Sequence, residues 1–145
     1  MKFLVTGGTG FIGKRVVAQL LQRNIDVIAT DINIDKEKVD FESYLSAKNV
    51  SSKNLELLEL DISSKEDLKK IFKNHKITNI IACGYQMSNL IDSNPIKGAE
   101  VNIVGMTNLF QAVMDNNIHR LIFPSSQSVY GTSSKIFDNK PIHED

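Results

Sequence analysis

The chain has 145 residues, enough for one domain with a sizeable apolar core. Its 17 basic and 17 acidic residues balance, so charge gives no reason to expect binding to nucleic acid or to an anionic membrane. No apolar stretch approaches the length of a bilayer span, and the single cysteine, Cys83, excludes an internal disulfide. Because an apolar strand already begins at residue 3, we expect a cytoplasmic protein without a signal peptide.

A glycine-rich loop follows the first predicted strand, Phe3–Val5. Gly7, Gly10 and Gly13 recur as G-x-x-G-x-x-G, and the spacing G-x-G-x-x-G begins at Gly8. Apolar residues at helical spacing follow, which predicts a helix directly after the loop. Glycines permit a tight turn and close backbone approach, and a helix N-terminus presents free N–H groups to phosphate oxygens. We therefore predict a pyrophosphate site at Gly7, Gly10, Phe11, Ile12 and Gly13.

An acidic residue, Asp31, follows the short second strand predicted at Val27–Ala29. It lies eighteen residues after Gly13, close to the roughly 20 residues at which dinucleotide sites place the acid that binds the ribose hydroxyls. A carboxylate there would repel a 2′-phosphate, which favours NAD over NADP. The alternative is a polar strand end with no ligand.

Apolar strands continue to alternate with helix-compatible segments. Ser63 and Glu66 have the spacing of a capping box, which predicts a helix that ends by His75. Helices are also expected over 35–48 and from Pro95 to Asn116, a polar stretch over 88–94, and strands over 55–60, 77–82 and 121–123. Such alternation predicts a Rossmann-type, doubly wound parallel sheet of order 3-2-1-4-5, with the chain ending soon after strand five.

Ligands of such sheets bind beyond the carboxyl ends of the strands, where the order reverses between strands one and four. Asp61 could accept a hydrogen bond from an adenine amino group while Ile62 packs on the ring. The alternative for Asp61 is a carboxylate at a helix start, favoured by the helix dipole. Small residues after strand four would let a ribose or ring approach the backbone. The further residues predicted to contact the cofactor are Asp61, Ile62, Ala82, Cys83, Gly84 and Ser125.

Four ordered segments carry a family resemblance: 6–13, 61–62, 102–109 and 120–131. They resemble the TGxxGxxG loop, the acid–hydrophobic adenine contact, the N-V-x-G-T-x-N-L helix and the F-x-S-S-x-x-V-Y-G segment. These motifs are typical of extended short-chain dehydrogenases, the NAD-dependent epimerase/dehydratase family, and their spacing resembles the nucleotide-sugar 4-epimerases. The sequence departs from the family at 81–84, usually H-x-A-A, and at Met106, where threonine is common. These departures leave the substrate class less defined than the cofactor.

The resemblance implies hydride transfer between NAD and a carbon of a nucleotide sugar, started by a tyrosine base with a lysine four residues later. It gives Ser126 the role of binding the reacting oxygen, with Ser125 nearer the cofactor; the alternative for both is a strand-end turn. The tyrosine and lysine are expected beyond residue 145. The Y-x-x-x-K at Tyr44–Lys48 is interpreted as chance, because it falls on the helix between strands two and three.

We therefore expect residues 1–145 to form an NAD-binding domain that lacks the base and the substrate-binding half. Alone, this chain is expected to show no turnover. Two other interpretations stay open: a non-catalytic dinucleotide sensor, and an inert product of a truncated gene.

The remaining polar candidates point to structure rather than chemistry. His75, His119 and His143 share no metal-ligand spacing with one another or with Cys83, so no metal site is predicted. His119 is expected at the surface. Asn102 lies in an otherwise apolar helix, and we expect it to bond a neighbouring backbone carbonyl rather than the cofactor.

The helix expected from Pro95 to Asn116 carries more apolar surface than one sheet face can cover. At 100° per residue its apolar side chains spread over an arc of roughly 220°. We therefore expect a homo-oligomer built through this helix or through strand five.

Overall fold

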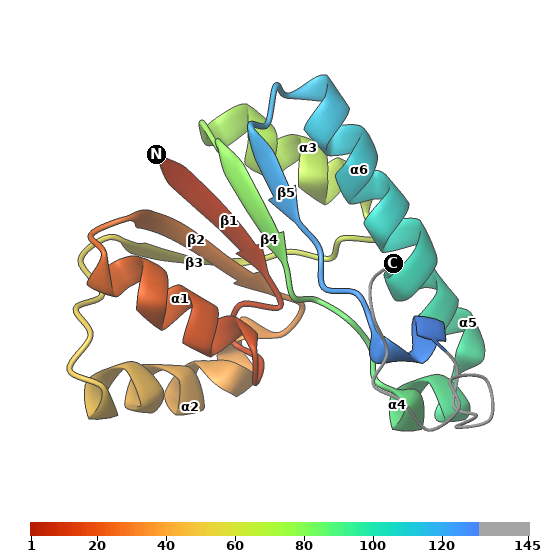
Figure 1. Cartoon of the computed structure of the whole chain (residues 1–145), viewed down its shortest axis with the longest axis horizontal. Helices are drawn as coiled ribbons and strands as arrows, with labels where there is room; N and C mark the ends of the chain where they lie inside the picture. The colour runs from red at the N-terminus through yellow and green to blue at the C-terminus, as the bar shows by residue number, and fades with distance from the viewer. Residues whose placement is uncertain (131–145) are drawn as a thin grey trace.

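The computed structural model of the protein describes residues 1–130, apart from the side chains of 88–90, 127 and 128. Within this part of the chain the sheet is parallel and has the order β3-β2-β1-β4-β5 (Figure 1). Its strands are β1 (Lys2–Thr6), β2 (Asp26–Asp31), β3 (Leu55–Glu59), β4 (Asn79–Ala82) and β5 (Arg120–Ile122). The predicted Rossmann-type sheet is therefore confirmed, and its order reverses between β1 and β4.

Helices cover both faces of the sheet (Figure 1). One face carries α1 (Gly13–Gln22) and α2 (Ile34–Ala47), and the other carries α3 (Lys65–Asn74) and α6 (Met106–Asp115). The remaining helical segments are α4 (Ser88–Ser93), α5 (Pro95–Ala99), the π-helix η1 (Glu100–Gly105) and the 3₁₀ helix η2 (Gln127–Tyr130).

The core is divided into two apolar clusters, one on each face of the sheet. Successive residues of a strand point to opposite faces, so Leu4 joins the cluster that includes Leu109 of α6, whereas Val5 joins the cluster that includes Val17 of α1 and Phe41 of α2. All five side chains have no exposed surface. Burial on both faces explains why the inner strands read as continuous apolar runs.

Asparagines in the left-handed region follow three of the helices. Asn24, Asn49 and Asn117, after α1, α2 and α6, have φ values of 56°, 52° and 52°. Asparagine is one of the few residues that adopts this region readily, and it commonly terminates helices there. Asn24 therefore terminates α1, one residue after its C-cap Arg23.

Two local predictions are wrong, and one stretch for which no element was predicted is partly helical. Ser64, not Ser63, caps α3 by accepting from the N–H of Asp67, because Ser63 is bonded to Asp61 instead. The polar stretch 88–94 contains the helix α4, since polar composition alone does not prevent a helical turn. The segment from Pro95 onward is not a uniform α-helix but contains the π-helix η1, which a regular period of 100° per residue cannot indicate.

Candidate functional site

The glycine loop connects β1 to α1, and two of its glycines are required by the packing of the loop itself. Gly7 has φ +61°, and a Cβ there would lie 2.6 Å from the Cα of Gly84. A Cβ on Gly13 would lie 2.0 Å from the carbonyl oxygen of Gly7. A Cβ on Gly10 would meet only that same oxygen, at 3.3 Å, so Gly10 leaves its outer side open to a ligand.

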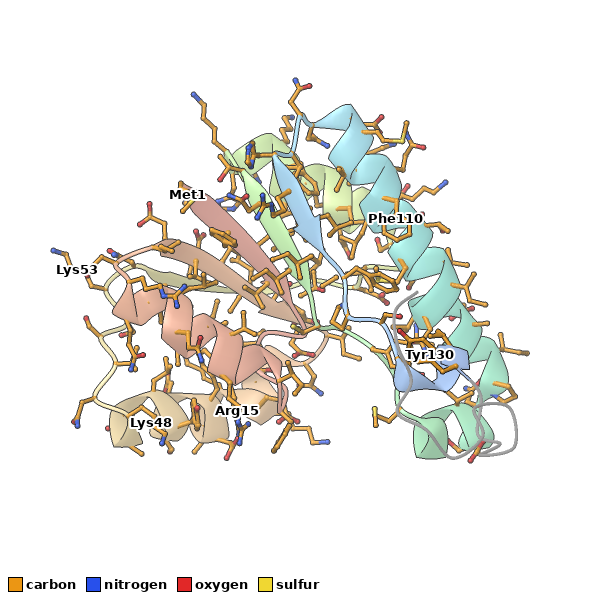
Figure 2. All side chains as sticks on the ribbon, in the orientation of Figure 1. Met1, Arg15, Lys48, Lys53, Phe110 and Tyr130 are labelled. Carbon is orange, nitrogen blue, oxygen red and sulfur yellow. The ribbon has the colours of Figure 1, made fainter. Side chains whose placement is uncertain are left out.

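The N-terminus of α1 offers donors for an anion. The N–H of Gly10 bonds the carbonyl of Gly7, at 3.2 Å, whereas the N–H groups of Phe11 and Ile12 have no acceptor within residues 1–130. Free N–H groups at a helix N-terminus, together with the helix dipole, favour phosphate oxygens. The guanidinium of Arg15, labelled in Figure 2, lies over the exposed Phe11 ring at 3.9 Å and donates to the carbonyl of Phe11.

The predicted ribose-binding acid lies directly against this loop. Asp31 ends β2, and its Oδ2 accepts a hydrogen bond from the hydroxyl of Thr9 at 2.7 Å. Its Oδ1 accepts from the N–H of Ile32 at 3.0 Å, and the N–H of Gly8 bonds the carbonyl of Thr30 at 2.8 Å. The structure therefore brings together the predicted phosphate loop and the predicted acid. Thr9, which joins them, was not identified from sequence.

Asp61 forms a turn before α3. Its Oδ1 accepts from the N–H and the hydroxyl of Ser63, at 2.9 and 2.6 Å, and its Oδ2 lies 3.5 Å from the Nζ of Lys97. Partial burial raises the pKa of the Asp61 carboxyl, but the Ser63 hydrogen bonds and the Lys97 charge outweigh it, so the net pKa is lowered. The hydrogen bonds agree with the helix-start alternative, and an adenine contact would have to use Oδ2.

Ile62, the residue predicted to pack on adenine, is buried. Its side chain is only 4% exposed and belongs to the apolar core. A Cβ on Gly105 would lie 2.6 Å from Cγ1 of Ile62, which shows how closely the side chain packs against η1. The side chain therefore offers little exposed surface to an adenine ring, and the contact with adenine stays a prediction.

Two asparagines fasten the loops that follow β3 and β4. The Nδ2 of the buried Asn108 donates to the carbonyls of Ile62 and Ser63, at 3.2 and 3.0 Å. Asn102 accepts from the N–H of Gln86 at 2.9 Å and donates to the carbonyl of Gln86 at 3.0 Å. The backbone role predicted for Asn102 is confirmed. Asn108 lay within a recognised motif, but the sequence did not indicate its role.

The residues after β4 pack closely against the end of β1. Ala82 is buried, and the N–H of Cys83 bonds the carbonyl of Thr6 at 2.9 Å. Burial raises the pKa of the Cys83 thiol, so this half-buried side chain stays protonated at neutral pH. Gly84 lies against Gly7, so the absence of a side chain at Gly84 lets the two loops pack closely, whether or not a ligand also uses this space.

Ser125 and Ser126 are exposed and lie between β5 and η2. The carbonyl of Ser126 accepts from the N–H of Val129 at 3.2 Å, so the segment does form a turn. Tyr44 lies on α2, as predicted, and Lys48 is the C-cap of that helix; Figure 2 shows Lys48 well separated from Tyr130 of η2. Tyr44 instead lies beside Lys14 and Arg15, whose charged groups are 5.4 and 5.5 Å from its ring centre.

Across the described residues, no three His, Cys, Asp or Glu side chains are grouped closely enough to hold a metal ion. The helices of the same region include none with the length and apolar character needed to cross a membrane.

The sheet, the glycine loop and the acid at the end of β2 define a Rossmann-type dinucleotide-binding domain. The chain belongs to the NAD dependent epimerase/dehydratase family, whose family model matches residues 3–145. It is 36% identical to the bifunctional UDP-glucose 4-epimerase and UDP-xylose 4-epimerase 1 of Pisum sativum over 138 residues, which are 93% of this chain and 39% of that protein.

Solved structures of UDP-glucose 4-epimerases resemble this chain in fold and sequence. The UDP-glucose 4-epimerase of Thermus thermophilus in complex with NAD is 29% identical, with a TM-score of 0.71 over 87% of this chain and 38% of that one. The Thermotoga maritima UDP-glucose 4-epimerase with UDP-glucose is also 29% identical, with a TM-score of 0.76 over 92% and 40%. The chain thus spans about two fifths of the length of these relatives.

Proposed function

We propose that this chain is the NAD-binding portion of a nucleotide-sugar 4-epimerase, with residues 1–145 forming a single domain. Family membership and the similar UDP-glucose 4-epimerases support this reading. The observation that carries it is the contact between Thr9 and Asp31, which joins a glycine loop with free N–H groups to an acid at the end of β2.

The donors and acceptors present match the chemical groups of NAD. The N–H groups of Phe11 and Ile12 would bind the pyrophosphate, and Asp31 would accept from the adenosine ribose hydroxyls. Oδ2 of Asp61 would accept from the adenine amino group. The small residues Ala82, Cys83 and Gly84 would border the rest of the cofactor, with Ser125 beside it.

Bound NAD would take a hydride from a sugar carbon and return it. In this proposal the hydroxyl of Ser126 orients the reacting oxygen of a nucleotide sugar. A proton must also leave that oxygen, and an unassisted serine is too weak a base for this at neutral pH. The only Y-x-x-x-K in residues 1–145 begins at Tyr44 on α2 and ends at the C-cap of that helix, so the base would be a residue outside this stretch.

We expect the chain to bind NAD at least ten-fold more tightly than NADP, because a 2′-phosphate would meet the charge of Asp31. Asp31→Asn should weaken NAD binding by about ten- to one hundred-fold, which is the usual contribution of hydrogen bonds to a charged group. It should also reduce the preference for NAD over NADP. Calorimetric titration with both cofactors measures this. Asp26→Asn, at the opposite end of β2, is the matched control and should change neither affinity. Equal affinities in the unaltered chain would contradict the role of Asp31.

We also propose that the chain self-associates through α6 and the end of β5. Phe110 and Phe123 stack edge to face with ring centres 6.0 Å apart, although both stay exposed. Other large apolar side chains of η1, α6 and β5 are also exposed: Ile103, Val104, Met114 and Ile122. A patch of this kind is typical of an interface.

Sedimentation at micromolar concentrations is therefore expected to show a dimer or a larger species. Phe110→Glu, at the position labelled in Figure 2, should shift it toward monomer because burying an unpaired charge opposes association. Val39→Glu, on the exposed side of α2, is the control and should leave the assembly unchanged. A monomer in the unaltered chain would refute this assembly.

A further inference from the structure

The hydroxyl of Thr9 is buried at the junction of the glycine loop and β2. Thr9 is 2% exposed, and its Oγ1 donates to Oδ2 of Asp31 at 2.7 Å. The other carboxylate oxygen accepts from the N–H of Ile32 at 3.0 Å. A carboxylate offers about four acceptor positions, so two bonds hold its orientation and about two positions stay available.

The backbone next to Thr9 is held against the end of β2. The N–H of Gly8 bonds the carbonyl of Thr30 at 2.8 Å, which ties the loop to the end of β2. A Cβ on Gly8 would lie 2.9 Å from the Cβ of Ala29, so the loop and the strand are in close contact. The loop therefore places Thr9 beside Asp31 in the ligand-free chain.

We propose that Thr9 is a positioning residue, whose hydroxyl holds the Asp31 carboxylate in the orientation that accepts the 2′-hydroxyl of the adenosine ribose and so sets the preference for NAD over NADP. This inference rests on the proposed NAD site. A carboxylate that is already oriented binds its ligand more tightly, because binding then does not have to restrict the motion of the carboxylate.

A purely structural role makes a different prediction. Buried hydroxyls commonly need a hydrogen-bond partner, and in that case loss of the Thr9 hydroxyl would lower stability and weaken every cofactor alike. A positioning role makes the loss depend on the ribose 2′-hydroxyl. The two roles are therefore separated by a cofactor that lacks this group.

The test compares Thr9→Val, which keeps the shape and removes the hydroxyl, with Thr9→Ser, which retains it. The full chain is titrated by calorimetry with NAD, with NADP and with 2′-deoxy-NAD, which here is NAD without the 2′-hydroxyl of its adenosine ribose. Thr9→Val should bind NAD about ten-fold more weakly, narrow the NAD to NADP ratio by a similar factor, and change 2′-deoxy-NAD binding less than about two-fold. Thr9→Ser should stay within about three-fold of the unaltered chain.

Thr30→Val is the matched control, because it removes another fully buried hydroxyl, one that donates to the carbonyl of Val5. The ratio of NAD to NADP affinity should be unchanged in this variant. If Thr9→Val does not fold, Thr9→Ala is used instead, because it removes the hydroxyl and leaves a smaller side chain. Its affinities for the same three cofactors are then compared. The inference is overturned if the variant binds all three cofactors equally more weakly, or if its ratio of NAD to NADP affinity is unchanged. The proposed function still stands in that case, provided that the unaltered chain binds NAD. Absence of NAD binding in the unaltered chain overturns both.

Discussion

Gly13→Ala is expected to abolish NAD binding and to lower the free energy of unfolding by about 3 kcal/mol or more. The new Cβ would lie 2.0 Å from the carbonyl oxygen of Gly7 and 2.7 Å from the Cα of Gly8. Both are backbone atoms of the same tight loop, so relief requires the loop to move away from the N-terminus of α1. Urea denaturation and calorimetric titration measure the two effects.

Gly10→Ala is the matched control within the same loop. Its Cβ would meet only the carbonyl oxygen of Gly7, at 3.3 Å, so stability should change by less than about 1 kcal/mol. NAD binding should nevertheless weaken, because the methyl group would occupy the space through which the pyrophosphate approaches. A Gly13→Ala chain that folds and binds NAD normally would contradict the loop geometry, and a Gly10→Ala chain that binds normally would place the phosphates elsewhere.

Asn108→Leu is expected to lower the free energy of unfolding by about 2–4 kcal/mol, because it leaves one buried and one partly buried carbonyl oxygen without their donor. Those oxygens belong to Ile62 and Ser63 and accept from Asn108 at 3.2 and 3.0 Å. The variant should also loosen the segment that carries Asp61. Urea denaturation reports the first effect, and amide hydrogen exchange over residues 60–64 reports the second.

Thr107→Val is the control for this position. Thr107 is exposed and its hydroxyl bonds only the carbonyl of Val104 in the preceding turn, at 2.8 Å. Its replacement should change the free energy of unfolding by no more than about 0.5 kcal/mol. If Asn108→Leu were equally mild, the bonds to the loop after β3 would not be the reason for an asparagine here.

Sequence by itself determined the sheet order, the glycine loop and the position of Asp31 at a strand end. These features follow from local patterns: apolar runs mark the strands, and right-handed crossovers leave few possible orders. The glycine spacing also indicated which positions cannot carry a side chain, and the collisions that a Cβ would cause at Gly7 and Gly13 agree with it.

Only the tertiary structure decided which side chains touch around the candidate site. Thr9 meets Asp31 across 22 residues of sequence, Asn102 meets Gln86 across 16, and Asn108 meets Ile62 across 46. No periodicity encodes such partners, because each pair depends on how loops from different strands meet at the edge of the sheet. The same cause explains why Asp61 binds Ser63 and leaves Ser64 to cap α3, and why Ile62 packs closely against η1.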